Sequence, residues 1–241
     1  MPEIQIEDDL TRAKRGITWM RLEEALGGTG CPVCSQIDKT EKHYLENLLY
    51  EYVLDVGVRR KLHHQHGFCS RHAQLALEAE KKLDSDGLHL ATMFETVIEE
   101  NRRLLESQSK QLEIMAKEAK KRRKKISLHS IDASKCFVCD FVKESEDIAT
   151  HAFLYFSNDK ELIGDYEKSE VVVCFRHLQM LVKEKVSAQI IDATLKKVNK
   201  INRDLSNFIR KHDYQSSHDY TKDELRSYRT AVNYFAGDYR W

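Results

Sequence analysis

The chain carries six cysteines whose spacing makes them candidates for metal binding. They stand at positions 31, 34, 69, 136, 139 and 174. Each of the last three lies 105 residues after its counterpart among the first three, and His177 lies 105 residues after His72. The motif C-x2-C, 34 residues, C-x2-H therefore occurs twice, which indicates an internal duplication. Three thiolates and one imidazole form a tetrahedral donor set that suits zinc.

The spacing predicts two zinc ions per chain, each bound within one repeat. C-x2-C brings two thiolates to one ion from a single turn, and C-x2-H does the same where it opens a helix, whose N-terminal dipole favours thiolates. Each ion would then join the starts of two helices 35 residues apart. The predicted ligands are Cys31, Cys34, Cys69 and His72 in the first repeat, and Cys136, Cys139, Cys174 and His177 in the second.

Other chemistry fits these residues less well. A thioredoxin-type dithiol needs a βαβ unit, of which the sequence shows no sign. A Cys–His nucleophile explains one pair of residues but not a repeated set of four. An iron–sulfur cluster stays open, because ligand identity alone does not exclude iron. The histidines at positions 63, 64 and 66 have no histidine or cysteine counterparts 105 residues later, so we interpret them as surface residues.

Helices must position these ligands. Apolar residues at helical spacing follow each C-x2-C and each C-x2-H. Beyond each clamp, a longer heptad pattern predicts a helix whose apolar stripe forms a packing core, at Ala91, Ile98, Leu105, Leu112 and Ala119 in the first repeat. An amphipathic helix is expected over residues 8–26. A C-terminal helix should begin at a capping box formed by Thr221 and Glu224, dock through an apolar face that includes Leu225, Tyr228, Val232 and Phe235, and end at Gly237.

The predicted fold is an all-α, internally duplicated helical bundle. Each repeat consists of a helical hairpin clamped by a Cys3His site, plus a long helix. We expect an N-terminal helix and turn over 1–30, repeats over 31–119 and 136–212, a basic linker over 120–135, and a C-terminal helix and tail over 213–241.

Composition agrees with a helical protein. Gly and Pro are scarce, at nine and two residues of 241, which argues against a turn-rich β-fold. Basic and acidic residues balance at 39 each, so net charge does not point to nucleic acid. Apolar stretches are short and no signal peptide is visible, so we expect a cytoplasmic protein without membrane contact.

One basic segment is a candidate nucleic-acid contact. Residues 117–125 carry seven cations and one anion, and phosphate binding would be their functional use. A solvated helix end, with cations near the C-terminal dipole, explains the same residues. The residues concerned are Lys120, Lys121, Arg122, Arg123, Lys124 and Lys125.

The motifs resemble those of a family of uncharacterised prokaryotic proteins. Its members carry CP-x-C and GFC-x-x-H twice, and they end in a helix with Trp-Arg-x-Ala. The first motif here matches over 31–34 and 67–72, whereas the second has Phe137 in place of Pro and 172–174 read VVC. Residues 228–231 stand where the terminal motif falls, and the likeness extends from about Thr18 to Gly237. The resemblance supports the ligand set and implies no activity.

Four protein ligands leave no open position for substrate or activated water, which argues against metal-dependent hydrolysis. The sequence also lacks a P-loop, a dinucleotide fingerprint and a nucleophile elbow. We therefore expect a binding or scaffold module, acting on an unknown protein partner or as a homo-oligomer, rather than an enzyme. A thiol-based redox or metal sensor and a nucleic-acid-binding protein are the alternatives.

Overall fold

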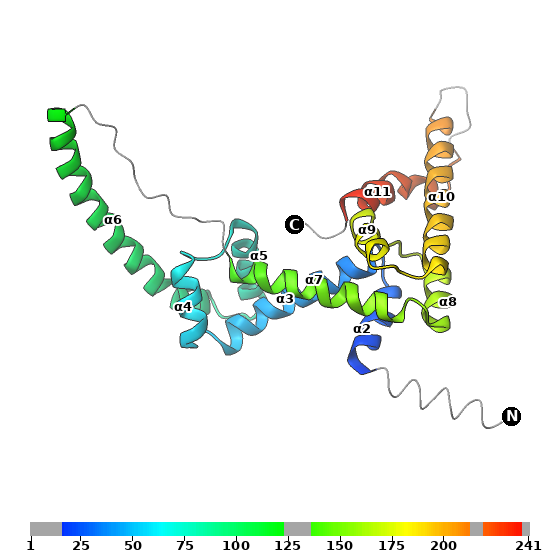
Figure 1. The fold of residues 1–241 in the computed structure, drawn as a ribbon, viewed down its shortest axis with the longest axis horizontal. Coiled ribbons are helices and arrows are strands. Elements are labelled where there is room, and N and C mark those ends of the chain that lie inside the picture. The colour runs from blue at the N-terminus through cyan, green and yellow to red at the C-terminus, as the bar shows by residue number, and fades with distance from the viewer. Residues whose placement is uncertain (1–15, 123–135, 213–218, 238–241) are drawn as a thin grey trace. The chain divides into compact units, whose positions relative to one another are not determined.

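The structure is a computed structural model that describes residues 16–122, 136–212 and 219–237. Every regular element in these ranges is an α-helix, and ten helices, α2 to α11, follow one another (Figure 1). The all-α prediction is confirmed. None of the described helices is long and apolar enough to cross a membrane. Residues 8–15 of the predicted N-terminal helix and residues 123–135 of the predicted linker lie outside the described residues.

The order of the helices repeats along the chain. The bounds of α7 lie 105 residues after those of α3, and α9 begins 105 residues after α5. Cys69 and Cys174 are the N-cap residues of α5 and α9, as expected for a C-x2-H that opens a helix. The paired helices are α3 (Pro32–Glu51) with α7 (Phe137–Phe156), α5 (Ser70–Lys82) with α9 (Phe175–Lys183), and α6 (Leu88–Arg122) with α10 (Ala188–Lys211).

The connector inside each repeat contains a short helix that the sequence analysis did not predict. These helices are α4 (Val56–His64) and α8 (Lys160–Lys168). Each begins at an aspartate: the Asp55 carboxylate accepts a hydrogen bond from the Val58 N–H, and the Asp159 carboxylate accepts from two backbone N–H groups. An aspartate is a favoured N-cap residue, so Asp55 and Asp159 could have indicated where these two helices begin.

The chain forms two compact units. The first unit comprises residues 1–39 and 144–241, and the second comprises residues 40–143. The boundaries between the units fall inside α3 and α7, so both helices contribute residues to both units. The domain boundaries expected from the sequence stay a prediction.

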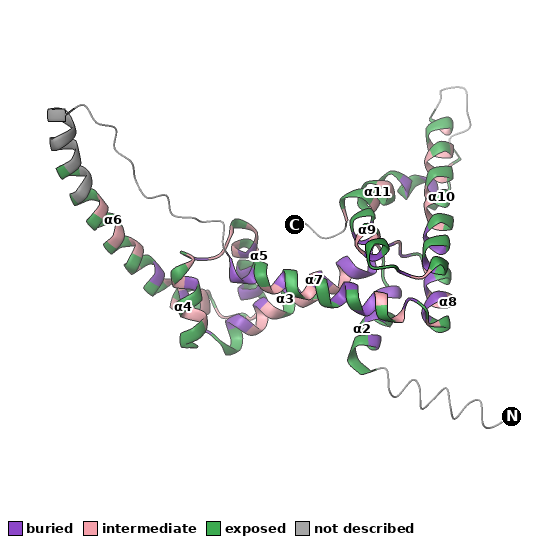
Figure 2. Ribbon diagram, viewed as in Figure 1, coloured by how far each residue is buried: buried purple, intermediate pink, exposed green. Residues whose placement is uncertain are grey.

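The first unit contains a well-buried core (Figure 2). Trp19 and Leu22 of α2 (Gly16–Leu26) are buried, and the Trp19 ring meets Phe156 edge-on at 4.9 Å between centroids. Tyr166 of α8 is fully buried, and its hydroxyl oxygen accepts a hydrogen bond from the Val173 N–H. Helix α10 packs against α8 and α11 (Lys222–Ala236), and α11 also contacts α9.

Helix α11 begins and ends where the sequence predicts, but its most buried residues lie outside the predicted apolar face, of which Tyr228 and Phe235 contact the rings of Phe208 and Phe175. Thr221 and Glu224 form the capping box, and Gly237 follows the last turn at φ 75°. Glu224 and Ser227 are buried, whereas the predicted docking residues stay largely exposed. The Glu224 carboxylate accepts a hydrogen bond from Lys211 of α10, and within the capping box it accepts another from the Thr221 N–H. The exposed residues of the apolar stripe are Leu225, Tyr228, Val232 and Phe235.

In the second unit, the first part of α6 packs against α4 and α5. Its buried residues are Met93 and Val97, while Ile98 and Leu105 of the predicted heptad stripe are 64% and 63% exposed. The prediction that this stripe forms a packing core is therefore wrong for its described side chains. The contacts of α4 and α5 select the neighbouring face of the helix. The side chains at positions 112 and 119 lie outside the described residues.

Candidate metal centres

Eight side chains of the two motifs gather in two groups of four. In each group, the four ligand atoms all lie within 4.8 Å of one another. The buried site, in the first unit, consists of Cys31, Cys34, Cys174 and His177. The partly exposed site, in the second unit, consists of Cys69, His72, Cys136 and Cys139.

The pairing predicted from the sequence is wrong. The C-x2-C of one repeat meets the C-x2-H of the other, so neither site closes within a repeat. The surroundings of His72 agree with this exchange. His72 lies beside Glu41, which stands seven residues, or a rise of about 10 Å, beyond Cys34 on α3.

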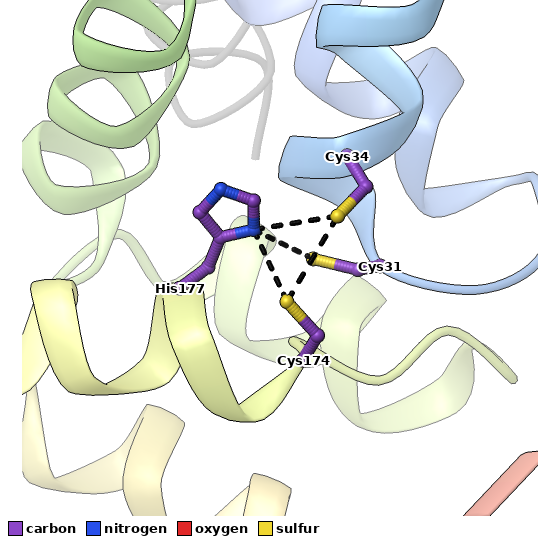
Figure 3. A group of neighbouring side chains, drawn as sticks. All are labelled: Cys31, Cys34, Cys174 and His177. Atoms are coloured by element: carbon purple, nitrogen blue, oxygen red, sulfur yellow. Dashed lines mark hydrogen bonds between the residues drawn. The ribbon is translucent and has the colours of Figure 1, made fainter. Parts of the chain in front are cut away.

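In the buried site, the four donors converge from the starts of α3 and α9 (Figure 3). His177 Nδ1 lies 3.5 Å from Cys31 Sγ, 3.4 Å from Cys34 Sγ and 3.2 Å from Cys174 Sγ. The sulfur atoms of Cys34 and Cys174 are 3.9 Å apart. All four residues are at most 1% exposed.

In the partly exposed site, the donors come from the starts of α5 and α7. His72 Nδ1 lies 3.1 Å from Cys69 Sγ, 3.5 Å from Cys136 Sγ and 3.4 Å from Cys139 Sγ. The sulfur atoms of Cys69 and Cys139 are 3.8 Å apart. His72 and Cys136 are buried, Cys69 is half-buried and Cys139 is exposed.

These distances fit a tetrahedral metal ion. With Zn–S bonds of about 2.3 Å and a Zn–N bond of about 2.0 Å, a tetrahedron has S···S edges of about 3.8 Å and S···N edges of about 3.5 Å. The observed S···S distances are 3.8 and 3.9 Å, and the S···N distances are 3.1 to 3.5 Å. Both groups therefore have the donor types and the size that a four-coordinate ion requires.

A buried glutamate orients the histidine in each site. His72 Nε2 donates to the Glu41 carboxylate at 2.7 Å, and Arg71 holds the same carboxylate through two hydrogen bonds of 3.2 and 2.6 Å. The Nδ1 atom of the same ring faces the three sulfur atoms, where a bound metal ion would take the place of a proton. Such carboxylate–histidine pairs fix the tautomer of a metal ligand and increase its basicity.

The same arrangement occurs in the buried site. His177 Nε2 lies 3.0 Å from the Glu146 carboxylate, which accepts from Arg176 at 3.0 to 3.1 Å. The ligand motifs alone do not predict a role for the glutamate and the arginine. Both residues nevertheless recur at the offset of 105 residues, and this repetition could have identified them.

The donors of the partly exposed site shift one another's pKa values. Burial raises the pKa of Cys139 to about 12, and the nearby Cys136 adds to the rise. Burial acts in the same direction on Cys136, but hydrogen bonds from His72 and from backbone groups outweigh it and lower the Cys136 pKa to about 6. Burial lowers the pKa of His72, but hydrogen bonds with Cys136 and Glu41 outweigh it and raise that pKa to about 10.

In the buried site, burial raises the pKa of Cys31 well above its ordinary value, and the adjacent Cys174 and Cys34 raise it further. Three neighbouring thiols resist ionisation together unless a cation compensates their charge. Binding of a divalent ion would therefore displace protons from both groups.

The other predicted site residues lie in the basic segment at the end of α6 and beyond it. Lys120, Lys121 and Arg122 belong to the end of α6, where only the backbone is described, and residues 123–125 lie outside the described residues. The nucleic-acid contact stays a prediction. In the histidine cluster, His64 and His66 are exposed and His63 is half-buried, 3.9 Å from the Glu100 carboxylate.

Comparison with known proteins connects the chain to one family. A model described as "Family of unknown function (DUF6062)" matches residues 13–240. The chain is 27% identical over 212 residues to the "Uncharacterized 23.9 kDa protein in xynA 3'region" of Caldicellulosiruptor sp. (strain Rt8B.4), and the match covers 86% of this chain and 95% of that protein. No solved structure matches the chain. The resemblance to an uncharacterised family is thus confirmed: the chain belongs to the DUF6062 family.

Proposed function

We propose that this protein is a zinc-binding scaffold in which two structural zinc ions hold helix starts together. The observation that supports the proposal best is the geometry of the two groups. Each offers three sulfur atoms and one histidine nitrogen at the edge distances of a tetrahedron, and a buried glutamate orients each histidine. A bound zinc ion would supply a stable cross-link with four protein ligands.

Such a cross-link closes long segments of the chain. In the buried site it joins Cys34 to Cys174, which lie 140 positions apart, and in the partly exposed site it joins His72 to Cys136, which lie 64 positions apart. The shorter segment is nested within the longer one. By analogy with disulfides, closing such loops is worth about 5 and about 4 kcal/mol, respectively. A structural role for both ions follows from these magnitudes.

A role in binding other molecules is supported by the apolar stripe of α11. Its side chains are 45 to 66% exposed, although the Tyr228 ring lies 6.3 Å from that of Phe208 and the Phe235 ring lies 5.7 Å from that of Phe175. Exposed apolar stripes of this kind are a feature of protein–protein contacts. The proposed partner of this stripe is a protein surface, either of a different protein or of a second copy of this chain.

The proposal is tested by elemental analysis of the full chain, purified without added metal. We expect two zinc ions per chain, no iron, and no visible absorption bands of an iron–sulfur cluster. Removal of the ions with a chelator should lower the melting temperature, and added zinc should restore it. Iron in stoichiometric amounts, or identical melting of the metal-free and metal-loaded protein, would contradict the proposal.

A further inference from the structure

The two sites differ most at one pair of equivalent cysteines. Cys34 and Cys139 lie 105 residues apart, each the second cysteine of a C-x2-C in the first turn of α3 or α7. Cys34 is 1% exposed, whereas Cys139 is exposed. Their donor sets and helix positions match, so the surroundings alone make the two thiols unequal in their access to solvent.

The first unit encloses its site with tyrosines and additional helices. The buried Tyr166 lies near enough to Cys31 for the two groups to interact electrostatically, and Tyr234 of α11 does the same with Cys174. In the described part of the second unit, no helix equivalent to α11 follows α6. Among the described residues of the second unit, the partly exposed site therefore has no counterpart of the cover that α11 provides in the first unit.

From this difference we infer that Cys139 is a modification site for peroxides, at which oxidation releases the metal of the partly exposed site and leaves the buried site intact. The inference rests on the proposed zinc binding. Metal-bound thiolates react with oxidants according to their access to solvent, so the exposed Cys139 reacts first.

The reaction takes place in two steps. The Cys139 thiolate attacks one oxygen of hydrogen peroxide, the O–O bond breaks, and a sulfenic acid and a hydroxide ion form. The Cys69 thiolate then attacks the Cys139 sulfur, a disulfide forms, and a second hydroxide leaves. Two protons from solvent convert both hydroxides to water. One peroxide is thus reduced by two electrons, and two thiolates are oxidised to one disulfide.

Cys69 is the partner thiol because its sulfur lies 3.8 Å from that of Cys139. The residue is half-buried, so it is partly accessible to solvent. Disulfide formation removes two of the four donors. Only Cys136 and His72 then remain on the ion, too few for a stable structural site.

The experiment treats the metal-loaded full chain with hydrogen peroxide in the presence of a chromogenic zinc chelator. We expect one zinc ion per chain to be released quickly, while the second is retained. Mass spectrometry of the digested protein should locate a disulfide between Cys69 and Cys139. A sulfenic-acid trap should label Cys139 about tenfold or more faster than Cys34, in line with their exposure.

The matched variants are Cys139→His and Cys34→His, which replace a thiol with another zinc ligand. Cys139→His should abolish the fast release of zinc, and Cys34→His should leave it unchanged. If either variant fails to bind two ions, the inference is still tested by the order in which Cys139 and Cys34 are labelled in the unmodified chain. Simultaneous release of both ions, earlier labelling of Cys34, or a disulfide between Cys136 and Cys139 would overturn the inference. A chain that holds no zinc at all would instead overturn the proposed function.

Discussion

The buried and the partly exposed site share their chemistry and differ in their surroundings. Both contain three cysteines and a histidine, and in both a glutamate and an arginine support the histidine. The hydrogen bonds of Glu41 in the partly exposed site measure 2.6 to 3.2 Å, and those of Glu146 in the buried site measure 3.0 to 3.1 Å. The duplication has therefore preserved the ligands and their supports, while only the first unit has a helix such as α11 to cover its site among the described residues.

The comparison also shows that the two motifs of a repeat are not the two halves of a site. Each C-x2-C is the first turn of a 20-residue helix, and the glutamate that serves the other site lies further along that helix. Helix α3 thus supplies Cys34 to the buried site and Glu41 to the partly exposed site, and α7 supplies Glu146 and Cys139 in the corresponding way. The exchange of ligands makes both sites depend on both repeats.

Double variants test the exchange most strongly. Cys34→Ser combined with Cys69→Ser removes one ligand from each site, so we expect both zinc ions to be lost. Cys34→Ser combined with Cys174→Ser removes two ligands from the buried site alone, so one ion should remain. Elemental analysis of the purified variants measures the counts.

Pairing within each repeat reverses these counts. In that arrangement, the first double variant would keep one ion and the second would keep none. Because each variant changes two cysteines to serine, the two proteins serve as controls for each other.

The next largest effect concerns stability. Cys174→Ser opens the longer loop and exposes a fully buried site to the loss of its ion, whereas Cys69→Ser opens the shorter, nested loop. A loss of about 5 kcal/mol corresponds to a decrease in melting temperature of about 10–20 °C for a chain of this size. We expect Cys174→Ser to approach this decrease and Cys69→Ser to fall short of it, as measured by calorimetry of the metal-loaded proteins.

Equal decreases in melting temperature for the two variants would show that the greater burial of the first site adds nothing to its contribution to stability. A larger decrease for Cys69→Ser would reverse the ranking of the two sites.

Much of the local structure around the sites was predictable from the sequence. The shared offset of 105 residues identified the eight candidate side chains, and the N-cap positions of Cys69 and Cys174 follow from the rule that C-x2-H opens a helix. The pairing was not predictable in the same way. In-repeat and exchanged pairings give the same donor set of three cysteines and one histidine, so the spacing does not distinguish them. The contact of His72 with Glu41, seven residues beyond Cys34, depends on the tertiary structure.

The sequence also did not predict which faces of the helices α6 and α11 are buried. The heptad pattern of α6 predicts an apolar stripe through Ile98 and Leu105, yet α4 and α5 cover Met93 and Val97 instead. Periodicity identifies which residues share a face, but tertiary contacts decide which face is covered. For α11, the ion pair between Lys211 and Glu224 accompanies the docking of the polar face, and apolar spacing carries no sign of it.

Replacing the supporting glutamates should weaken each site separately. Glu41→Gln should reduce the zinc affinity of the partly exposed site about 10–100-fold, because the neutral amide no longer increases the basicity of His72. Glu146→Gln should do the same to the buried site. Competition with a chelator of known affinity gives both constants.

Since Glu41 and Cys34 share α3, a general disturbance of that helix would weaken the buried site as well. Unchanged affinity of the buried site in Glu41→Gln therefore separates a supporting role from simple misfolding.

The smallest expected effect is a dependence on pH of the docking of α11. The hydrogen bond from Lys211 and the backbone of Thr221 lower the pKa of Glu224, and the hydrogen bond from Lys200 lowers that of Asp223. A carboxyl whose pKa is lower in the folded state stabilises that state above its unfolded pKa, and the stabilisation disappears as the pH falls through the folded value. Docking should therefore be fully favoured at pH 7 and weaken progressively below about pH 5.

Acid also protonates the zinc ligands, so the measurement must separate the two effects. We compare the unmodified chain with Lys211→Met, which removes the cation and leaves the site ligands in place. Hydrogen exchange of the α11 amides should be slower in the unmodified chain at pH 7, and this difference should shrink towards zero in acid, where Glu224 is neutral in both proteins. Protonation of the zinc ligands affects both chains alike and cancels in the difference. A difference that persists at low pH would mean that other contacts of Lys211, such as the hydrogen bond from its Nζ to the Asp219 carbonyl, hold α11 rather than the ion pair with Glu224.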